Sequence, residues 1–127
     1  MNEADLKGLL VRECRIIMPT FVTIRHEDRF THGIPDITVT GNKKTLWSEV
    51  KLAKPDFKSK GIQDLTMLRL RDKGYAIYVV YQEATDGNKY TFIVDPKEIG
   101  TSINMWTNFV FGFNHSWVAN EFKKILE

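Results

Sequence analysis

Asp36, Glu49 and Lys51 are the residues whose types and spacing best suit chemistry. Asp36 follows Pro35. Glu49 stands thirteen positions after Asp36, and Lys51 stands fifteen positions after Asp36. Carboxylates are oxygen ligands that Mg²⁺ and Mn²⁺ accept, and a lysine beside them can stabilise charge that develops in a transition state. Together they would suit metal-assisted hydrolysis of a phosphodiester. Separately, Pro-Asp is common where a strand starts and Glu-x-Lys is common on solvated strands, so the hypothesis depends on the fold.

A β-hairpin over residues 34–51 would bring these side chains together. With Asn42 and Lys43 at the centre of the turn, Asp36 falls opposite Glu49, at the roughly 5 Å Cβ separation of cross-strand neighbours. Side chains alternate between the faces, so one face carries Asp36, Thr38, Thr40, Thr45, Trp47, Glu49 and Lys51, and the other carries Ile37, Val39, Leu46 and Val50. Opposed carboxylates repel unless one is protonated or a cation lies between them. The pattern therefore predicts a divalent ion there.

The rest of the chain predicts the elements that surround this hairpin. Apolar periodicity predicts helices over residues 3–17, 62–73 and 116–126, and strands over 21–25, 34–40, 45–52, 75–82 and 90–95. Residues 101–113 fit neither pattern clearly. The order α-β-β-β-α-β-β-α predicts an α/β fold with a central mixed β-sheet flanked by helices. A length of 127 residues predicts a single domain over residues 1–127.

Pro35-Asp36 followed by Glu49-Val50-Lys51 resembles the signature of the PD-(D/E)XK nucleases, and the order of elements resembles that family's core. Gly33-Ile34-Pro35-Asp36, with Gln63 in the following helix, is more narrowly similar to the virus-type replication-repair nuclease branch (VRR-NUC). Holliday junction resolvases of the same superfamily are similar in length and layout. The resemblance covers roughly residues 3–82 and implies a restriction-endonuclease-like core and a metal-dependent DNA endonuclease.

The resemblance also implies a role for each residue of the motif. Asp36 and Glu49 would bind Mg²⁺ or Mn²⁺, the backbone carbonyl of Val50 would add a ligand, and Lys51 would assist the attacking water and the transition state. Gln63 would face the site from the helix after the motif, although an exposed helix glutamine is the alternative.

The family places a further glutamate on the first helix, and two residues match it here. Glu3 is favoured because its spacing from Leu6, Leu9 and Leu10 is that of the family's helix, and Glu13 is the alternative. An acidic residue near a helix N-terminus is also favourable to the helix dipole, whatever its function. Cys14 lies on the apolar stripe of the same helix and is expected to be a core residue, not a nucleophile.

The charge distribution points to a polyanionic partner. The net charge is only +2, yet residues 43–73 carry nine basic and four acidic residues. Lys54, Lys58 and Lys60 are expected to contact DNA phosphates beside the site. A solvated lysine-rich face is the alternative. His26 and His32 flank a polar segment before Asp36, where a base role is open but simple exposure is the more common outcome.

The resemblance extends to substrate, assembly and location. A compact domain of this kind suggests a structure-specific enzyme for branched DNA such as a Holliday junction, encoded by a phage and acting in the host cytoplasm, with no membrane association. A catalytically silent nuclease fold used for DNA binding or assembly is the rival interpretation. Two symmetric nicks in a junction need two sites, which predicts a homodimer. Its interface would use the C-terminal aromatic residues, unless these simply cover the sheet: Trp106, Phe109, Phe111, Phe113, Trp117 and Phe122.

Overall fold

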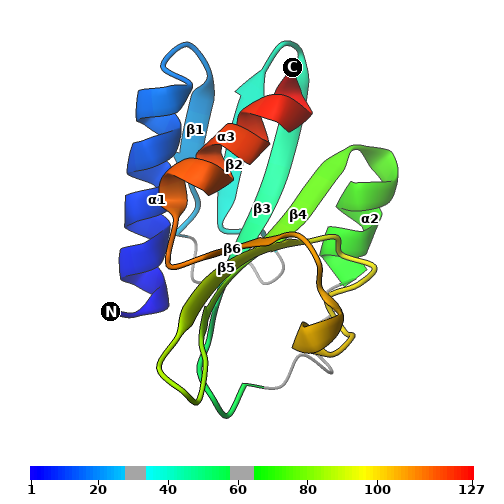
Figure 1. The fold of residues 1–127 in the computed structure, drawn as a ribbon. Coiled ribbons are helices and arrows are strands. Elements are labelled where there is room, and N and C mark those ends of the chain that lie inside the picture. The colour runs from blue at the N-terminus through cyan, green and yellow to red at the C-terminus, as the bar shows by residue number, and fades with distance from the viewer. Residues whose placement is uncertain (28–33, 58–64) are drawn as a thin grey trace.

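The computed structural model describes residues 1–27, 34–57 and 65–127, which form a mixed β-sheet with helices on both faces (Figure 1). In this part of the chain the elements are α1 (Glu3–Ile17), β1 (Val22–Arg25), β2 (Ile37–Gly41), β3 (Lys44–Ala53), α2 (Leu65–Lys73), β4 (Tyr75–Glu83), β5 (Lys89–Val94), the 3₁₀ turn η1 (Ile103–Met105), β6 (Phe109–Phe111) and α3 (His115–Leu126). The α/β class and the mixed sheet flanked by helices are confirmed.

The strands of the sheet follow one another in chain order, from β1 to β6. Neighbouring strands are antiparallel except β3 and β4, which are parallel and are joined through α2. A parallel pair needs such a crossover because the chain must return to the same end of the sheet. Glu49 and Lys51 therefore lie on β3, the strand that joins the antiparallel and parallel parts of the sheet.

The β2–β3 hairpin has the register that the sequence predicts. Thr40 pairs with Thr45, and the paired ladder ends at Ile37 and Ser48, so Asp36 lies one position beyond it, level with Glu49. Asn42 and Lys43 adopt φ values of 52° and 63°, the left-handed conformation at both central residues that a type I′ turn requires. This turn twists in the sense of the strands and fixes which side chains share a face.

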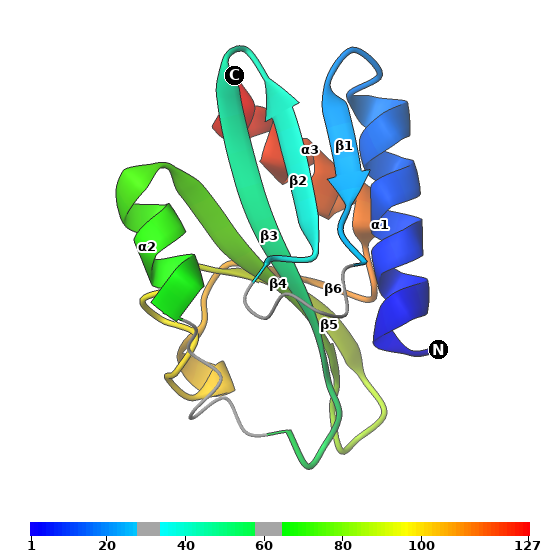
Figure 2. The ribbon, with the colours of Figure 1, turned by 180° about the vertical axis from the view of Figure 1, so that it is seen from behind.

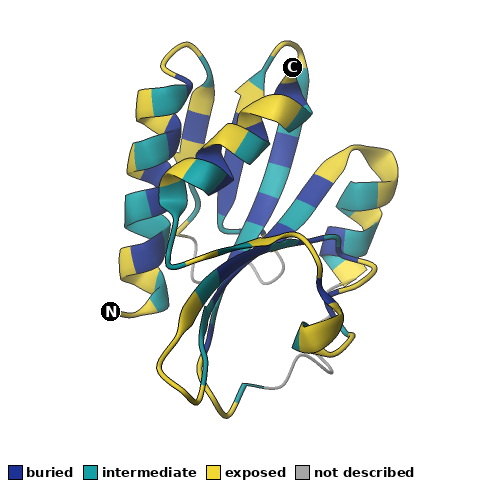
Figure 3. Ribbon diagram, viewed as in Figure 1, coloured by how far each residue is buried: buried dark blue, intermediate teal, exposed yellow. Residues whose placement is uncertain are grey.

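Two hydrophobic clusters hold the layers together, one on each face of the sheet. Along α1 and α3, buried positions alternate with exposed ones (Figure 3). On one face α1 and α3 cover the inward residues of the hairpin, with Leu6, Val39, Val50 and Phe122 fully buried. On the other face lies α2 (Figure 2). Its Met67 belongs to the second cluster with Tyr78, and Trp47 packs against that cluster. The hairpin residues thus divide between the faces as their alternation predicts.

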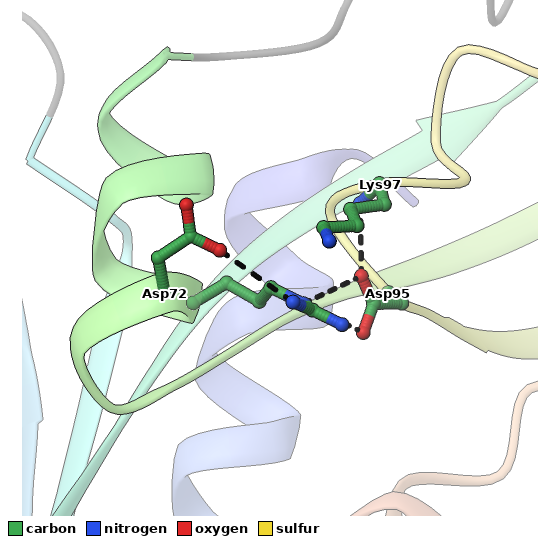
Figure 4. Close-up of polar contacts among 4 residues, drawn as sticks. Asp72, Asp95 and Lys97 are labelled. Atoms are coloured by element: carbon green, nitrogen blue, oxygen red, sulfur yellow. Dashed lines mark hydrogen bonds and ion pairs between the residues drawn. The ribbon is translucent and has the colours of Figure 1, made fainter.

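Polar contacts fix the start of α1 and the turn that follows β5. Asn2 and Asp5 form a capping box that starts α1, with Asn2 Oδ1 accepting from the Asp5 amide at 2.9 Å and Asp5 Oδ2 accepting from the Asn2 amide at 3.1 Å. Arg71 ties α2 to the residue that follows β5, because its Nε lies 3.2 Å from the Asp95 carboxylate (Figure 4). Asp95 also accepts from the Lys97 amide, so this carboxylate closes the turn after β5 as well.

The region that the sequence leaves ambiguous contains η1 and β6. Trp106 and Phe122 are buried, and Phe113 and Trp117 pack against the cluster beneath α1 and α3. Of the six C-terminal aromatic residues, only Phe109 and Phe111 on β6 are exposed, with 41% and 76% of their surface accessible. Most of these rings therefore cover the sheet, as the alternative interpretation expected.

Candidate active site

Asp36 lies just before β2 and reaches across to β3. Its Oδ2 accepts a hydrogen bond from the Val50 amide at 2.8 Å, and its backbone carbonyl accepts from the His26 amide at 2.8 Å. The carboxylate is about four-fifths buried, with 19% of the side chain exposed. Asp36 is therefore held against the edge of β3 where β2 no longer pairs with it.

Glu3 reaches the same edge of β3 from the first turn of α1. Its Oε1 accepts from the Leu52 amide at 2.9 Å. Glu13, the alternative, lies elsewhere on the helix, where its charge acts on Cys14 and the His115 imidazole. The structure thus brings Glu3, and not Glu13, to the edge of β3 that Asp36 also contacts.

The backbone of Val50 lies between these two carboxylates. In an extended strand the N–H and C=O of one residue point to the same side, so the outward groups along this edge of β3 follow the order Val50 N–H, Val50 C=O and Leu52 N–H. Asp36 accepts from the first and Glu3 from the last. The Val50 carbonyl is therefore flanked by two carboxylates, while its side chain is buried in the core.

Glu49 and Lys51 project from β3 on the face opposite to Val50. Lys51 Nζ lies 3.7 Å from Glu49 Oε2, and 15% of the Glu49 side chain and 30% of the Lys51 side chain are exposed. The cross-strand neighbours of Glu49 and Lys51 on β4 are the buried residues Tyr78 and Val80. An acid and a base are thus paired at the margin of an apolar surface, within the sequence motif.

Lys7 is a member of this cluster that sequence reasoning did not single out. Its Nζ lies 3.0 Å from Asp36 Oδ1, and only 21% of its side chain is exposed. The signal was present in the chain, because Lys7 stands four residues after Glu3 and therefore on the same side of α1. The expectation of two uncompensated carboxylates is thus incomplete, since an ammonium group already neutralises Asp36.

The groups along this edge of β3 offer oxygen atoms, the donor type that hard divalent cations prefer. Among the residues that the structure describes, no group of three or more His, Cys, Asp and Glu side chains is close enough to hold a metal ion alone. Mg²⁺, however, is usually bound through one or two carboxylates, with water and phosphate oxygens completing the octahedron. Asp36, Glu3, Glu49 and the Val50 carbonyl supply only oxygen donors, and the Lys7 ammonium lies against Asp36 Oδ1.

The remaining predicted residues are placed less directly. His26 stacks on Trp47 with 6.0 Å between ring centroids, and its Nε2 lies 2.9 Å from Thr38 Oγ1. Lys54 is exposed immediately after β3. Four predicted residues lie outside the described ranges: His32, Lys58, Lys60 and Gln63.

A second basic surface lies between α1 and β1, away from the lysine-rich segment. Arg12, Arg15 and Arg25 line a groove of about 410 Å³ together with Gly8, Val11 and Ile16. Arg15 Nη2 donates to the Thr23 carbonyl at 3.2 Å, and Arg25 pairs with Glu27 at 3.1 Å. Three guanidinium groups on one groove could contact phosphates. Their spacing in the sequence does not reveal this, because Arg25 joins the groove from another element.

Burial controls the titration of the groups on the α1–α3 face. It raises the pKa of the Cys14 thiol to about 12, with a smaller contribution from Glu13, and it also raises the pKa of the Tyr81 hydroxyl. It lowers the pKa of His115, whose Nδ1 lies 2.8 Å from Tyr81 Oη. Cys14 is therefore a protonated core residue at neutral pH and cannot act as a thiolate nucleophile.

Comparison with known proteins finds no protein-family model and no curated protein that matches this chain. None of the described helices is both long enough and apolar enough to cross a membrane.

Proposed function

We propose that the protein is a Mg²⁺- or Mn²⁺-dependent DNA endonuclease of the PD-(D/E)XK type. The observation that carries the proposal is the edge of β3, where Asp36 and Glu3 accept from the Val50 and Leu52 amides on either side of the Val50 carbonyl. Glu49 and Lys51 stand on the same strand at the neighbouring positions. The order β1–β2–β3–β4, antiparallel and then parallel after α2, supports a restriction-endonuclease-like core.

The proposed metal ligands are Asp36, Glu49 and the Val50 carbonyl, with Glu3 assisting. A bound divalent ion would supply Lewis acidity at the scissile phosphate and lower the pKa of an attacking water. The Lys7 ammonium at Asp36 Oδ1 would repel a divalent ion bound to the same carboxylate. Binding of the ion and movement of the Lys7 ammonium are therefore coupled.

Lys51 is proposed to stabilise the negative charge that accumulates on the phosphate oxygens. Its ammonium group is oriented by Glu49 at 3.7 Å and lies at the border of a buried surface, where charge–charge interactions are stronger than in bulk water. Glu49 thus has two proposed functions, as a ligand and as the group that positions Lys51.

Branched DNA is the proposed substrate, and a homodimer is the proposed assembly on a Holliday junction. The basic residues beside the site and the arginine groove would contact phosphates, which position a nucleic acid without reading its sequence. A phage-encoded protein acting in the cytoplasm of the host fits this proposal.

A nicking assay tests the proposal. Linear, single-stranded, flapped and four-way DNA substrates are incubated with the protein in Mg²⁺, in Mn²⁺ and in EDTA. Asp36→Asn, Glu49→Gln and Lys51→Ala should each reduce cleavage at least about 100-fold, since each removes charge stabilisation at the reacting phosphate. Glu121→Gln is the matched control, because Glu121 pairs with Lys124 on the surface of α3.

Two results would contradict the nuclease proposal. Cleavage that persists in EDTA would exclude a metal-dependent reaction. Cleavage by Asp36→Asn at the wild-type rate would exclude Asp36 as a metal ligand. DNA that is bound tightly but never cut would instead support the silent binding module.

A further inference from the structure

We propose that a pocket with aromatic walls, between β5, β6 and η1, binds an unpaired nucleobase of the DNA strand held at the candidate active site. The inference rests on the proposed nuclease function and adds to it a preference for DNA that exposes a single-stranded base. The pocket has a volume of about 490 Å³. Its lining is Gln82, Ala84, Tyr90, Phe92, Ser102, Ile103, Asn104, Trp106 and Phe109.

The rings around the pocket are held in fixed orientations. Phe92 contacts Trp106 with ring centroids 5.4 Å apart and planes at 76°, and Tyr90 contacts Phe109 at 6.0 Å and 77°. Trp106 Nε1 donates to the Glu98 carbonyl and to Thr101 Oγ1, both at 3.1 Å, so its polar atom is satisfied away from any ligand. Rigid aromatic walls of this kind suit a flat ring, because stacking needs little rearrangement.

The polar groups of the pocket distinguish a base from a phosphate. None of the lining residues carries a formal charge, whereas a phosphate site would need cationic groups or several amide donors. Gln82 and Asn104 offer side-chain amides, and Ser102 donates its hydroxyl to the Asn104 amide oxygen. Amides and hydroxyls can form hydrogen bonds with the edges of an unpaired base. The lining therefore fits a neutral, planar and partly polar group.

The register of the sheet relates the pocket to the active site. Lys51 pairs with Val80, Val80 pairs with Phe92, and Phe92 pairs with Phe109. Paired residues share a face of the sheet, so Lys51 and the rings lie on the same face. Two strand spacings of about 4.8 Å separate Lys51 from Phe92, roughly 10 Å or about three nucleotide steps at 3.4 Å of rise. One DNA strand could thus occupy both places.

Binding measurements in EDTA test this inference separately from cleavage. Fluorescently labelled single strands and flapped duplexes, each with one abasic position, are titrated with the wild-type protein. We expect binding to weaken about tenfold, the effect of losing one stacked base, when the abasic site stands at one particular position or at either of two adjacent positions. At the other positions the abasic site should leave the affinity unchanged. The same oligonucleotides should bind Phe109→Ala with equal affinities, because this variant lacks one wall of the pocket.

Met105→Ala is the control for local disturbance. Met105 is 67% exposed and lies between Asn104 and Trp106, but it does not line the pocket. Its variant should keep the wild-type pattern. A cooperative thermal unfolding transition checks that both variants are folded. Phe109→Ala is expected to fold because Phe109 lies on an edge strand with 41% of its surface exposed.

The outcomes separate the two proposals. DNA that is bound and cut, but with equal affinities at all abasic positions, would overturn the base pocket and leave the nuclease. DNA that is neither bound nor cut would overturn both. If Phe109→Ala binds all oligonucleotides as the wild type does but loses self-association seen by light scattering, the rings belong to an interface with a second copy and the base pocket is wrong.

Discussion

Replacing Lys7 with methionine should destabilise the metal-free protein and increase its response to Mg²⁺. Lys7 Nζ and Asp36 Oδ1 are 3.0 Å apart, and each side chain is about four-fifths buried. At an effective dielectric constant near 20, the Coulomb attraction at this distance is about 5 kcal/mol. Desolvation of the two groups offsets more than half of it, which leaves a net contribution of about 2 kcal/mol. Methionine keeps the apolar stem, so most of the loss is electrostatic.

The expected shift is large enough for a thermal melt. For a chain of this length, 2 kcal/mol corresponds to a melting temperature lower by about 6–8 °C in EDTA. Millimolar Mg²⁺ should restore more stability to Lys7→Met than to the wild type, because no ammonium group competes for Asp36 and binding to the folded state stabilises it by mass action. Sodium chloride at the same ionic strength controls for screening.

Lys124→Met is the matched control. Lys124 pairs with Glu121 at 3.2 Å, but its side chain is 69% exposed, so its loss should cost under about 0.5 kcal/mol. A double-mutant cycle of Lys7→Met with Asp36→Asn should give a coupling of about 1–2 kcal/mol. If Lys7→Met melts at the wild-type temperature in EDTA, or if Mg²⁺ stabilises both proteins equally, the ion pair does not stabilise the fold or does not compete with the metal.

Three further outcomes are expected. Stability to urea should fall as the pH drops below about 6.5, because the unfolded His115 takes up a proton that burial disfavours in the fold; His115→Gln should flatten this dependence, and an unchanged slope would contradict it. Iodoacetamide should modify Cys14 only in denaturant, as mass spectrometry can show, since burial raises its pKa to about 12; rapid labelling of the native protein would disprove this. Light scattering with a four-way junction should detect a homodimer, and a strict monomer, free and bound, would favour a flap or single-strand nuclease instead.

The local features of the fold could be predicted because local physics determines them. Residues 3–17 form the helix that their apolar stripe predicts, and Asn42-Lys43 sets the hairpin register. The register alone places Asp36 level with Glu49 and buries Val50 on the opposite face. These relations depend on neighbours within about 20 residues, for which periodicity and turn geometry are sufficient.

The contacts between distant segments could not be predicted in this way. The ion pair of Lys7 with Asp36 depends on how α1 lies against the hairpin, and no periodicity within the helix specifies its partner. Likewise, β6 has only three residues, two of them exposed phenylalanines, and this is too short to produce a clear alternation. Its identity as a strand comes from pairing with β5, which is a property of the assembled sheet.

The sequential order of the strands also has a consequence for the folding of the nascent chain. Each described strand pairs with the next one in sequence, which keeps loop closures short and favours rapid folding. A long-range contact is made by α3, which packs on α1 and reaches back to the hairpin turn, where Asn42 Nδ2 donates to the Leu126 carbonyl at 2.8 Å. At about 5–20 residues per second, residues 52–126 take roughly 4–15 s to synthesise after Lys51. During that interval the apolar face of α1 and the hairpin has no cover, so this core can be completed only after α3 has been synthesised.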